Sequence, residues 1–370
     1  MIKYIQIENF KSLKRVAFPL ENLNLFFGMN GMGKSSVIQS LLLLRQSFWE
    51  SHRINLDCLY TNGELIRLGT AKDIICQNAE EDIIRFYLQY SEQKKYDFKY
   101  TYKYMDNDSE MDRLYRSNPS EDFLYDEALF TDDFVYLSAE HLAPQKQYST
   151  ENWKRDSVTK FGTIGQYVVP FMAVEGETYK VPDALCLPNS KTNRLIDQVS
   201  AWMSEISPGI KLSAEMLTAI EKATLSIRYS GKRLDSEPFM PVNVGFGIPY
   251  VLPLIVALLT STKDSLLLIE NPESHLHPKG QTMIAELVAR VAENGTQIIC
   301  ESHSDHIING IRVAVKHGKL KKDHLSVSFF SKSESQDTII QDILVDENGN
   351  LSDYPKGLLD EWGILMAELM

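Results

Sequence analysis

One eight-residue segment constrains this chain more than any other, and it reads Gly28-Met29-Asn30-Gly31-Met32-Gly33-Lys34-Ser35. It fits the pattern G-x-x-x-x-G-K-[ST], in which glycines let backbone N–H groups approach phosphate oxygens closely. A strand-like apolar run precedes it at 23–27, and a helix-like run follows it from Ser36. A helix that starts here presents the positive end of its dipole to phosphate. The segment therefore predicts a nucleotide site between a strand and a helix.

Each residue type in this phosphate loop has an expected role. Lys34 is expected to reach the β- and γ-phosphates, and the Ser35 hydroxyl is expected to ligate Mg²⁺. A chance match to the pattern arises in about one random chain in a hundred of this length, given the usual glycine content. We therefore expect ATP or GTP to bind with Mg²⁺. The predicted nucleotide-binding residues are Gly28, Asn30, Gly31, Gly33, Lys34, Ser35 and Ser36.

The composition is that of a globular protein. The chain has 370 residues, 44% of them hydrophobic and 24% charged, which is ordinary for folded proteins and excludes wholesale disorder. No apolar run reaches the ~18 residues of a membrane span, and the first residues lack a signal-peptide layout. The four cysteines are scattered without metal-ligand spacing. We expect a cytoplasmic protein with reduced thiols and no membrane partner.

The net charge of −12 bears on nucleic-acid binding. An acidic protein repels the phosphate backbone on average, so direct DNA contact requires a local basic patch. Solvated surface lysines are the more common interpretation of each short basic cluster. The candidate clusters are Lys11/Lys14/Arg15, Lys94/Lys95 and Lys319/Lys321/Lys322.

The chain alternates strand-like and helix-like segments, which predicts an α/β fold with parallel central strands. We expect an N-terminal half of the core at 1–79, an inserted subdomain at 80–235 and a C-terminal half at 236–370. The insert is predicted to be β-rich and then helical, with a mobile acidic stretch at 106–133. Strands are expected at 2–7, 16–20, 23–27, 134–137, 265–269, 296–300, 327–330 and 338–345, and helices from 35 to 49 and at 194–206, 280–291, 305–316 and 358–369.

A second set of polar residues follows the apolar run Leu266–Ile269. Glu270 ends this run and is suited to hold Mg²⁺, and Glu273 offers a further carboxylate that could polarise the attacking water. The next apolar run ends in Glu301-Ser302-His303-Ser304, where His303 could sense the γ-phosphate. A capped strand end would explain any one of these residues, but not all of them in this order after a phosphate loop.

These motifs together resemble the ABC-type ATPases of the OLD, RecF and SMC group. The resemblance rests on the motifs above, on Asn9-Phe10-Lys11-Ser12 and on Glu270-Asn271-Pro272-Glu273-Ser274-His275-Leu276-His277-Pro278. It is greatest to small stand-alone ATPases of bacterial anti-phage defence systems, such as the Septu-like ATPase subunit. Residues 1–75 and 240–318 carry it well, 354–357 carry it weakly, and in the middle Tyr136–His141 echoes it, with His141 where relatives often have Arg.

The resemblance implies an ABC-ATPase-like head with a mixed sheet flanked by helices, and a homodimer or higher oligomer with ATP held between subunits. One subunit supplies the phosphate loop, and the other supplies a signature motif, here Asn243-Val244-Gly245-Phe246-Gly247. A helix is expected at Pro249–Leu259, with Pro249 in the first helical position. Relatives often carry Ser and Gln where this chain has Pro249 and Tyr250. The implied signature residues are Asn243, Gly245 and Gly247.

The chain departs from its relatives at the end of the Leu266–Ile269 run. Strong ATPases of this group carry two acids there, whereas this chain has Glu270 and Asn271. Asn271 cannot accept a proton, although it can orient a water molecule. We expect catalytic roles for Glu270, Asn271, Glu273 and His303, and slow hydrolysis. For His275 and His277 we favour contacts at the dimer interface or γ-phosphate over zinc, because further ligands are missing at useful spacing.

Three functions compete at this stage. The first is an ATP-gated dimer that controls a partner nuclease, for example of the HNH type, in anti-phage defence, with DNA contacted directly or through the partner. The second is a DNA-clamping repair ATPase of the SMC or RecF kind, and the third is a transporter subunit. The acidic charge and the lack of a long heptad pattern weaken the second, and Asn9-Phe10-Lys11-Ser12 favours the DNA-associated branch over the third.

The departure at Asn271 makes a testable prediction. Glu270→Gln should abolish turnover, because it removes the Mg²⁺ carboxylate. Asn271→Glu should raise the steady-state ATPase rate, because it supplies the general base that the chain lacks. A rate that Asn271→Glu leaves unchanged would contradict the argument about the missing base.

Overall fold

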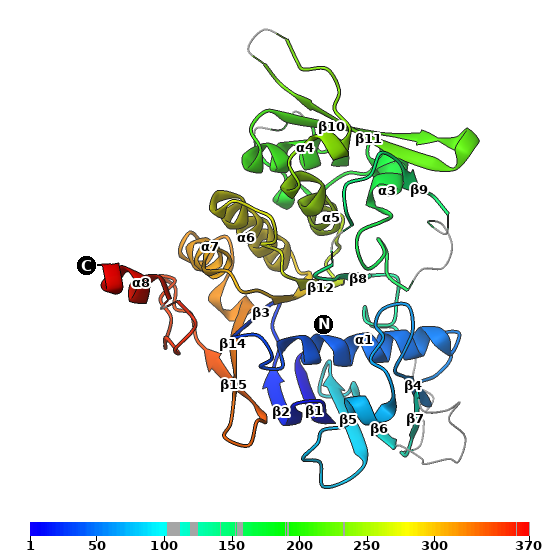
Figure 1. The fold of residues 1–370 in the computed structure, drawn as a ribbon, viewed down its shortest axis with the longest axis vertical. Helices are drawn as coiled ribbons and strands as arrows, with labels where there is room; N and C mark the ends of the chain where they lie inside the picture. Colours follow the sequence, from blue (N-terminus) through cyan, green and yellow to red (C-terminus); the bar gives the residue numbers. More distant parts are fainter. Residues whose placement is uncertain are drawn as a thin grey trace. The chain divides into compact units, whose positions relative to one another are not determined.

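The chain forms two compact units (Figure 1). Unit 1 contains Met1–Asp132, Leu325–Asp346 and Leu351–Met370, and unit 2 contains Asp133–His324 and Glu347–Asn350. This computed structural model describes residues 1–101, 112–118, 125–140, 142–151, 153, 158–188, 190, 192–231, 234–359 and 361–369.

A six-stranded antiparallel sheet forms much of unit 1, in the order β2-β1-β5-β6-β7-β4. Along its strands buried and exposed residues alternate, as in Ile83–Gln89, which gives the sheet one apolar face. Helix α1 (Lys34–Glu50) covers that face (Figure 1). The strands are β1 (Tyr4–Phe10), β2 (Leu13–Pro19), β4 (Cys58–Tyr60), β5 (Ile83–Gln89), β6 (Lys95–Thr101) and β7 (Arg113–Arg116), and a short helix, α2, spans Ala71–Ile74.

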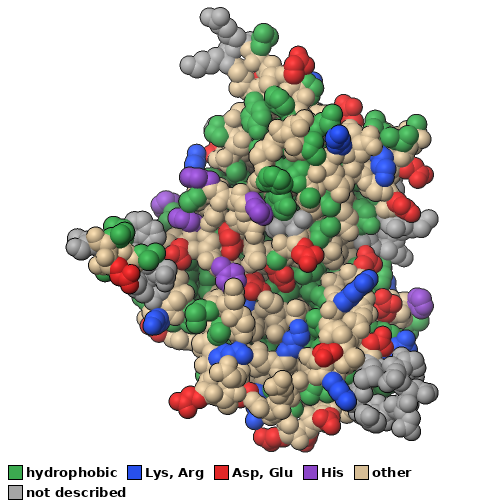
Figure 2. All heavy atoms as spheres, in the orientation of Figure 1, with side chains coloured by type: hydrophobic (Ala, Val, Ile, Leu, Met, Phe, Trp, Pro, Cys, Tyr) green, Lys and Arg blue, Asp and Glu red, His purple; other side chains and the backbone are tan. Residues whose placement is uncertain are grey.

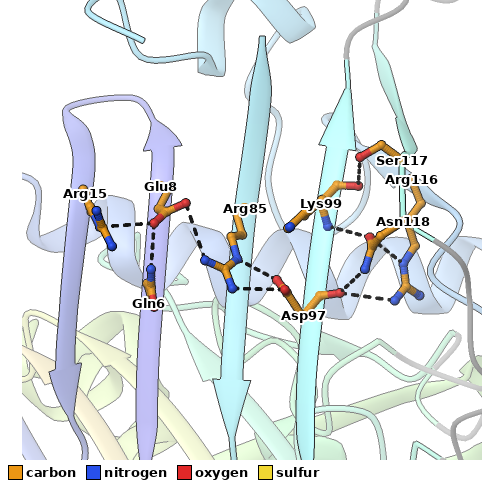
Figure 3. Close-up of polar contacts among 9 residues, drawn as sticks. All are labelled: Gln6, Glu8, Arg15, Arg85, Asp97, Lys99, Arg116, Ser117 and Asn118. Carbon is orange, nitrogen blue, oxygen red and sulfur yellow. Dashed lines mark hydrogen bonds and ion pairs between the residues drawn. The ribbon is translucent and has the colours of Figure 1, made fainter. Parts of the chain in front are cut away.

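The opposite face of this sheet carries a row of charged and polar side chains (Figure 3). Glu8 on β1 accepts from Arg15 on β2 at 3.3 Å, and Arg85 on β5 binds Asp97 on β6 with two hydrogen bonds of 2.7 and 3.0 Å. Asn118 extends the row by donating to the Asp97 carbonyl at 2.7 Å. Such half-exposed pairs add little net stability, but they keep this face polar while the other face is buried.

Unit 1 contains three further strands near the phosphate loop. β3 (Leu23–Phe27) precedes the loop in the sequence, and residues of β14 (Leu325–Lys332) and β15 (Thr338–Ile343) contact it. All five residues of β3 are buried. β3 runs parallel to β14, which pairs in the antiparallel sense with β15. The chain ends in helix α8 (Glu361–Leu369). The first and last parts of the sequence therefore meet in one sheet.

Unit 2 contains the parallel strands β8 (Phe134–Leu137), β12 (Leu266–Glu270) and β13 (Gln297–Glu301). Glu270 and Glu301 are register partners at the carboxyl ends of β12 and β13, which brings the predicted catalytic segments of both strands to one edge. The helices of this part are α5 (Gly247–Leu259), α6 (Pro278–Glu293) and α7 (Asp305–Lys316).

The rest of unit 2 contains a three-stranded sheet in the order β10-β11-β9. Its centre is a long hairpin, β10 (Ile210–Leu217) and β11 (Lys222–Tyr229), which the sequence analysis did not predict. The remaining elements are β9 (Tyr148–Ser149), helices α3 (Val168–Glu175) and α4 (Leu195–Ile206), and short 3₁₀ turns at Asp183–Leu185, Thr218–Ile220, Pro241–Asn243 and Lys322–His324.

The predicted fold class is confirmed: both units mix helices with sheets, and the chain includes parallel and antiparallel strand pairs. The predicted pairing of strands near 327–330 and 338–345 is also confirmed. Residues 80–235 were predicted as one insert. In the structure, 80–132 belong to unit 1, where β5 pairs with β1, and 133–235 belong to unit 2. Parts of the predicted mobile stretch 106–133, and His141, lie outside the described residues.

The candidate DNA-binding lysines have partners within their own units. Lys319, Lys321 and Lys322 contact Glu286, Glu293 and Glu347 at 2.7, 3.2 and 3.2 Å. In the other two clusters Lys14, Arg15, Lys94 and Lys95 also meet carboxylates, whereas Lys11 donates to the Gln39 side chain at 2.6 Å. Figure 2 shows acidic and basic side chains interspersed over the face that it views. Among the described residues, no helix is both long and apolar enough to cross a membrane.

Candidate nucleotide-binding site

The phosphate loop lies between β3 and α1, as predicted. Gly28, Gly31 and Gly33 have φ angles of 134°, 78° and 103°, a range that L side chains adopt only with strain. A Cβ on Gly28 would lie 2.3 Å from the Phe330 carbonyl oxygen of β14. Glycine is therefore required at Gly28 both by its backbone conformation and by the neighbouring strand. Asn30 and Gly31 are exposed at the tip of the loop.

Lys34 is held inside the loop. Its side chain is only 2% exposed, and its Nζ donates to the carbonyl oxygens of Gly28 and Met29, both at 2.9 Å. These two bonds fold the loop around the ammonium group. A buried cation at this position is ready to attract phosphate oxygens, because its burial strengthens its field.

Helix α1 begins directly behind the loop. Gly33 is its N-cap in the left-handed conformation, and among the described residues no side chain caps the helix. The first-turn residues Ser35 and Ser36 are half-buried. The positive end of the helix dipole therefore lies at the loop, where it favours an anion. All seven predicted nucleotide-binding residues lie together in this part of unit 1.

A cavity of about 440 Å³ lies beside the loop within unit 1. It is lined by both β1–β2 turn residues and the β14–β15 connection, and Ser12 links it to the loop through Thr338. The volume is in the range of small-ligand sites. The lining residues are Lys11, Ser12, Lys72, Asp73, Ile75, Cys76, Gln77, Asn78, Lys332, Gln336 and Asp337.

In unit 2, Glu270 is the last residue of β12, and its surroundings disfavour the ionised form of its carboxyl group. Burial, and the nearby Glu301 carboxylate, raise the pKa of Glu270 from 4.5 to about 7, and hydrogen bonds from Ala139 N (3.2 Å) and the Tyr136 hydroxyl (3.4 Å) only partly offset this. A nearby cation lowers the free-energy cost of ionising such a carboxyl group. Such a group is suited to Mg²⁺.

Asn271 follows Glu270 with a φ of 49°, a conformation that Asn tolerates better than most residues. Its backbone N–H donates to the Glu301 carbonyl at 2.9 Å. Its side-chain Oδ1 is buried and accepts no hydrogen bond from the part of the chain that the structure describes. Buried acceptors of this kind in folded proteins are usually satisfied by a water molecule or an ion.

Both carboxylate oxygens of Glu273 accept hydrogen bonds from the segment after β13. Its Oε1 accepts from His303 N at 2.7 Å and its Oε2 accepts from Ser302 Oγ at 2.9 Å. The His303 ring is partly exposed, and its Nε2 lies 3.8 Å from Glu301 Oε1. Glu273 therefore holds the segment that carries His303. Its observed contacts suit a positioning residue better than the substitute base considered from sequence.

The signature segment packs against the loop after β12. A Cβ on Gly247 would lie 2.5 Å from the His275 carbonyl oxygen, and the rings of Tyr250 and His275 are 4.5 Å apart. Asn243 and Gly245 are exposed. The prediction that Pro249 opens the helix is wrong: α5 starts at Gly247, and Pro249 lies in its first turn, where the missing proline N–H costs no intrahelical hydrogen bond.

His275 and His277 have separate surroundings. His275 lies against Tyr250, and His277 is the N-cap of α6, where its Nδ1 accepts from Lys279 N at 3.3 Å. The structure thus brings together Glu270, Asn271, Glu273, His303 and the signature segment in unit 2. Sequence reasoning missed Thr338 and Phe330, which contact the loop, because neither belongs to a motif.

A family model described as "AAA domain, putative AbiEii toxin, Type IV TA system" matches residues 23–309. The chain belongs to this family. A second model, "Protein of unknown function (DUF3696)", matches residues 320–369 of this AAA-domain protein. No curated protein matches.

Solved structures show the fold of this AAA-domain protein. An SMC head bound to the C-winged helix domain of ScpA is 12% identical with a TM-score of 0.51, and the match covers 93% of this chain and 98% of that one. The SMC head domain from Thermotoga maritima is 12% identical with a TM-score of 0.48, covering 93% and 99%. An SMC head with an extended coiled coil, bound to the C-terminal domain of ScpA and derived from Pyrococcus furiosus, is 11% identical with a TM-score of 0.48, covering 100% and 99%. The first of these matches shows that the chain shares the fold of an SMC head.

The raised pKa of Glu270 predicts a pH-dependent stability. The folded state binds this proton more tightly than the unfolded state, so the free energy of unfolding falls as pH rises from about 4.5 to about 7. Above that window the penalty is at most on the order of 3 kcal/mol. Glu270→Gln should therefore stabilise the nucleotide-free protein in urea unfolding at pH 8, with little effect at pH 5.

Glu286→Gln is the matched control. Burial opposes ionisation of Glu286, but hydrogen bonds from Lys319 and Arg290 prevail and lower its pKa. This variant should therefore lose stability at pH 8. An equal stability change for Glu270→Gln at both pH values would contradict the assigned pKa.

Proposed function

We propose that this protein is a Mg²⁺-dependent ABC-type ATPase that acts as an ATP-gated switch. The observation that carries the proposal is the phosphate loop, in which three positive-φ glycines, an enclosed Lys34 and an uncapped helix start form an anion site. Membership of an AAA family and the SMC-head fold support ATP as the ligand. We assign the β- and γ-phosphates to this loop.

The residues present suit a magnesium ion. Ser35 lies in the first turn of α1 in unit 1, and Glu270 in unit 2 is a carboxylate whose proton a cation would displace. When bound, Mg²⁺ would neutralise charge on the β- and γ-phosphates. In this proposal Asn271 Oδ1 orients a water molecule, and Glu273 keeps the His303 segment in place. Asn271 cannot take a proton from that water, so hydrolysis is slow and the bound state persists.

The cavity beside the loop gives the nucleoside a place in this proposal. It shares Ser12 with the loop contacts, and its lining mixes amide, ammonium and carboxylate groups with the apolar Ile75. Polar groups that converge on a part-apolar cavity are typical of ligand sites. We assign the base and ribose to this cavity.

We further propose that ATP joins two copies of the chain head to tail. The resemblance to ABC-type ATPases implies that the signature residues Asn243, Gly245 and Gly247 of one copy meet the nucleotide of the other. The exposure of Asn243, Gly245 and Phe246, with a Phe246 side chain 65% exposed, is consistent with an interface. A closed dimer would then control a partner protein.

The proposed partner is a nuclease on a separate chain, because the candidate catalytic segments among the described residues all fit an ATPase. The resemblance to defence ATPases supports an HNH-type enzyme acting on invader DNA. The acidic net charge and the carboxylate partners of Lys319, Lys321 and Lys322 favour DNA contact through that partner rather than directly. The defence role rests on the family resemblance.

The composite site predicts complementation between two inactive variants. Lys34→Ala should lose ATP binding, and Gly245→Asp should bind ATP but lose turnover. Gly245 suits this test because no described atom lies within 4 Å of a Cβ placed there. A 1:1 mixture should recover about a quarter of wild-type turnover, because half of randomly paired dimers are mixed and each keeps one of two sites.

The measurement is the steady-state ATPase rate of each variant and of the mixture. Lys316→Ala, which changes an exposed lysine at the end of α7, is the matched control and should leave ATP binding unchanged. A mixture as inactive as its components would contradict the site shared in trans. Full ATP affinity in Lys34→Ala would contradict the assignment of the phosphate loop.

A further inference from the structure

The phosphate loop is contacted by a residue from the far end of the chain. Thr338, the first residue of β15, is 6% exposed, and its Oγ1 donates to the Met32 carbonyl oxygen at 3.0 Å. A second hydroxyl, Ser12 Oγ, lies 2.9 Å from Thr338 Oγ1. A hydroxyl has one proton, and a carbonyl oxygen can only accept. Thr338 therefore donates to Met32, and Ser12 donates to Thr338.

The backbone holds Thr338 in place for this contact. Its N–H donates to the Ser12 carbonyl oxygen at 2.9 Å, so the start of β15 is tied to the β1–β2 turn. The contact with the loop is also tight, because a Cβ on Gly33 would lie 2.5 Å from Thr338 Oγ1 and 3.1 Å from Ser12 Oγ. The hydroxyl pair thus packs directly against the last turn of the loop before Lys34.

The direction of the Met32 carbonyl determines the direction of a neighbouring donor. In a planar trans peptide the C=O and the following N–H point in opposite directions. A Met32 carbonyl that faces Thr338 therefore turns the Gly33 N–H away from Thr338. Gly33, with a φ of 103°, has the conformational freedom to let this peptide rotate if the carbonyl were released.

We propose that Thr338 is a positioning residue for nucleotide binding, which fixes the Met32–Gly33 peptide so that the Gly33 N–H is aimed at phosphate. This inference rests on the proposed function of the phosphate loop. It gives a role to the C-terminal region, which matches a family of unknown function at residues 320–369. Phe330, from the partner strand of the same hairpin, braces the other end of the loop beneath Gly28.

The test compares Thr338→Val with Thr338→Ser. Valine keeps the shape of threonine but cannot donate to Met32, whereas serine keeps the donor. We expect Thr338→Val to raise the Kd for Mg-ATP by about five- to tenfold, the equivalent of one net hydrogen bond. Thr338→Ser should bind within about twofold of wild type, since it keeps that bond. Isothermal titration calorimetry with Mg-ATP, and with Mg-ADP, measures both.

Thr296→Val is the matched control. Thr296 Oγ1 also donates to a backbone carbonyl, that of Thr262, at 2.8 Å. Both residues belong to unit 2, whereas the phosphate loop belongs to unit 1. Its loss should lower the melting temperature to a similar extent as Thr338→Val and leave the Kd unchanged. Ser12→Ala, which keeps the Thr338–Met32 bond, should weaken binding less than Thr338→Val does and serves as the second variant if valine impairs folding.

The outcomes separate this proposal from the proposed function. If wild type and Lys34→Ala both fail to bind Mg-ATP, the proposed function is wrong. If wild type binds and Thr338→Val binds equally well, only the role of Thr338 is wrong. If Thr338→Ser is as weak as Thr338→Val, the hydroxyl is not the positioning group, and the proposal is overturned.

Discussion

The close approach between the phosphate loop and the β14–β15 hairpin is the constraint on which the candidate site depends. The Phe330 carbonyl oxygen occupies the space where a Gly28 side chain would lie, and Thr338 holds the Met32 carbonyl. Lys34 then closes the loop from inside through the Gly28 and Met29 carbonyl oxygens. A glycine-rich loop of a few residues has too much conformational freedom to keep one backbone conformation by itself. Here β14, which lies far along the sequence, supplies the support, because it pairs in parallel with β3 directly before the loop.

In unit 2, the carboxylates of Glu270 and Glu273 have different hydrogen-bond partners, and these partners give them different roles. Glu273 accepts from Ser302 and His303 and is thereby committed to holding a segment. Glu270 accepts hydrogen bonds of 3.2 and 3.4 Å from Ala139 and Tyr136, and burial raises its pKa to about 7. A group left in this state responds to the arrival of a cation. This difference supports the proposed switch. In that switch, magnesium nucleotide would change the charge state of Glu270, and Glu273 would keep its hydrogen bonds.

The sequence predicted the parts whose chemistry is local. The phosphate loop, the apolar run of β12 and the α/β alternation all have short-range patterns, and the structure contains each of them. The β10–β11 hairpin was missed because its turn, Thr218–Glu221, lacks the glycine or asparagine signal of tight hairpins. Thr338 and Phe330 could not be found from sequence, since their contacts arise only when distant segments pair. The start of α5 was placed two residues late because proline favours the first helical position, whereas Pro249 is the third residue of this helix.

The most direct test of the ATP-gated switch is the mass of the wild-type protein by light scattering, with and without Mg-ATP, together with its turnover under the same conditions. The account predicts tight binding, a larger particle in the presence of ATP and slow hydrolysis. Fast turnover with an unchanged mass would contradict the switch, and would indicate an ATPase in which a carboxylate other than the one missing at Asn271 acts as the base.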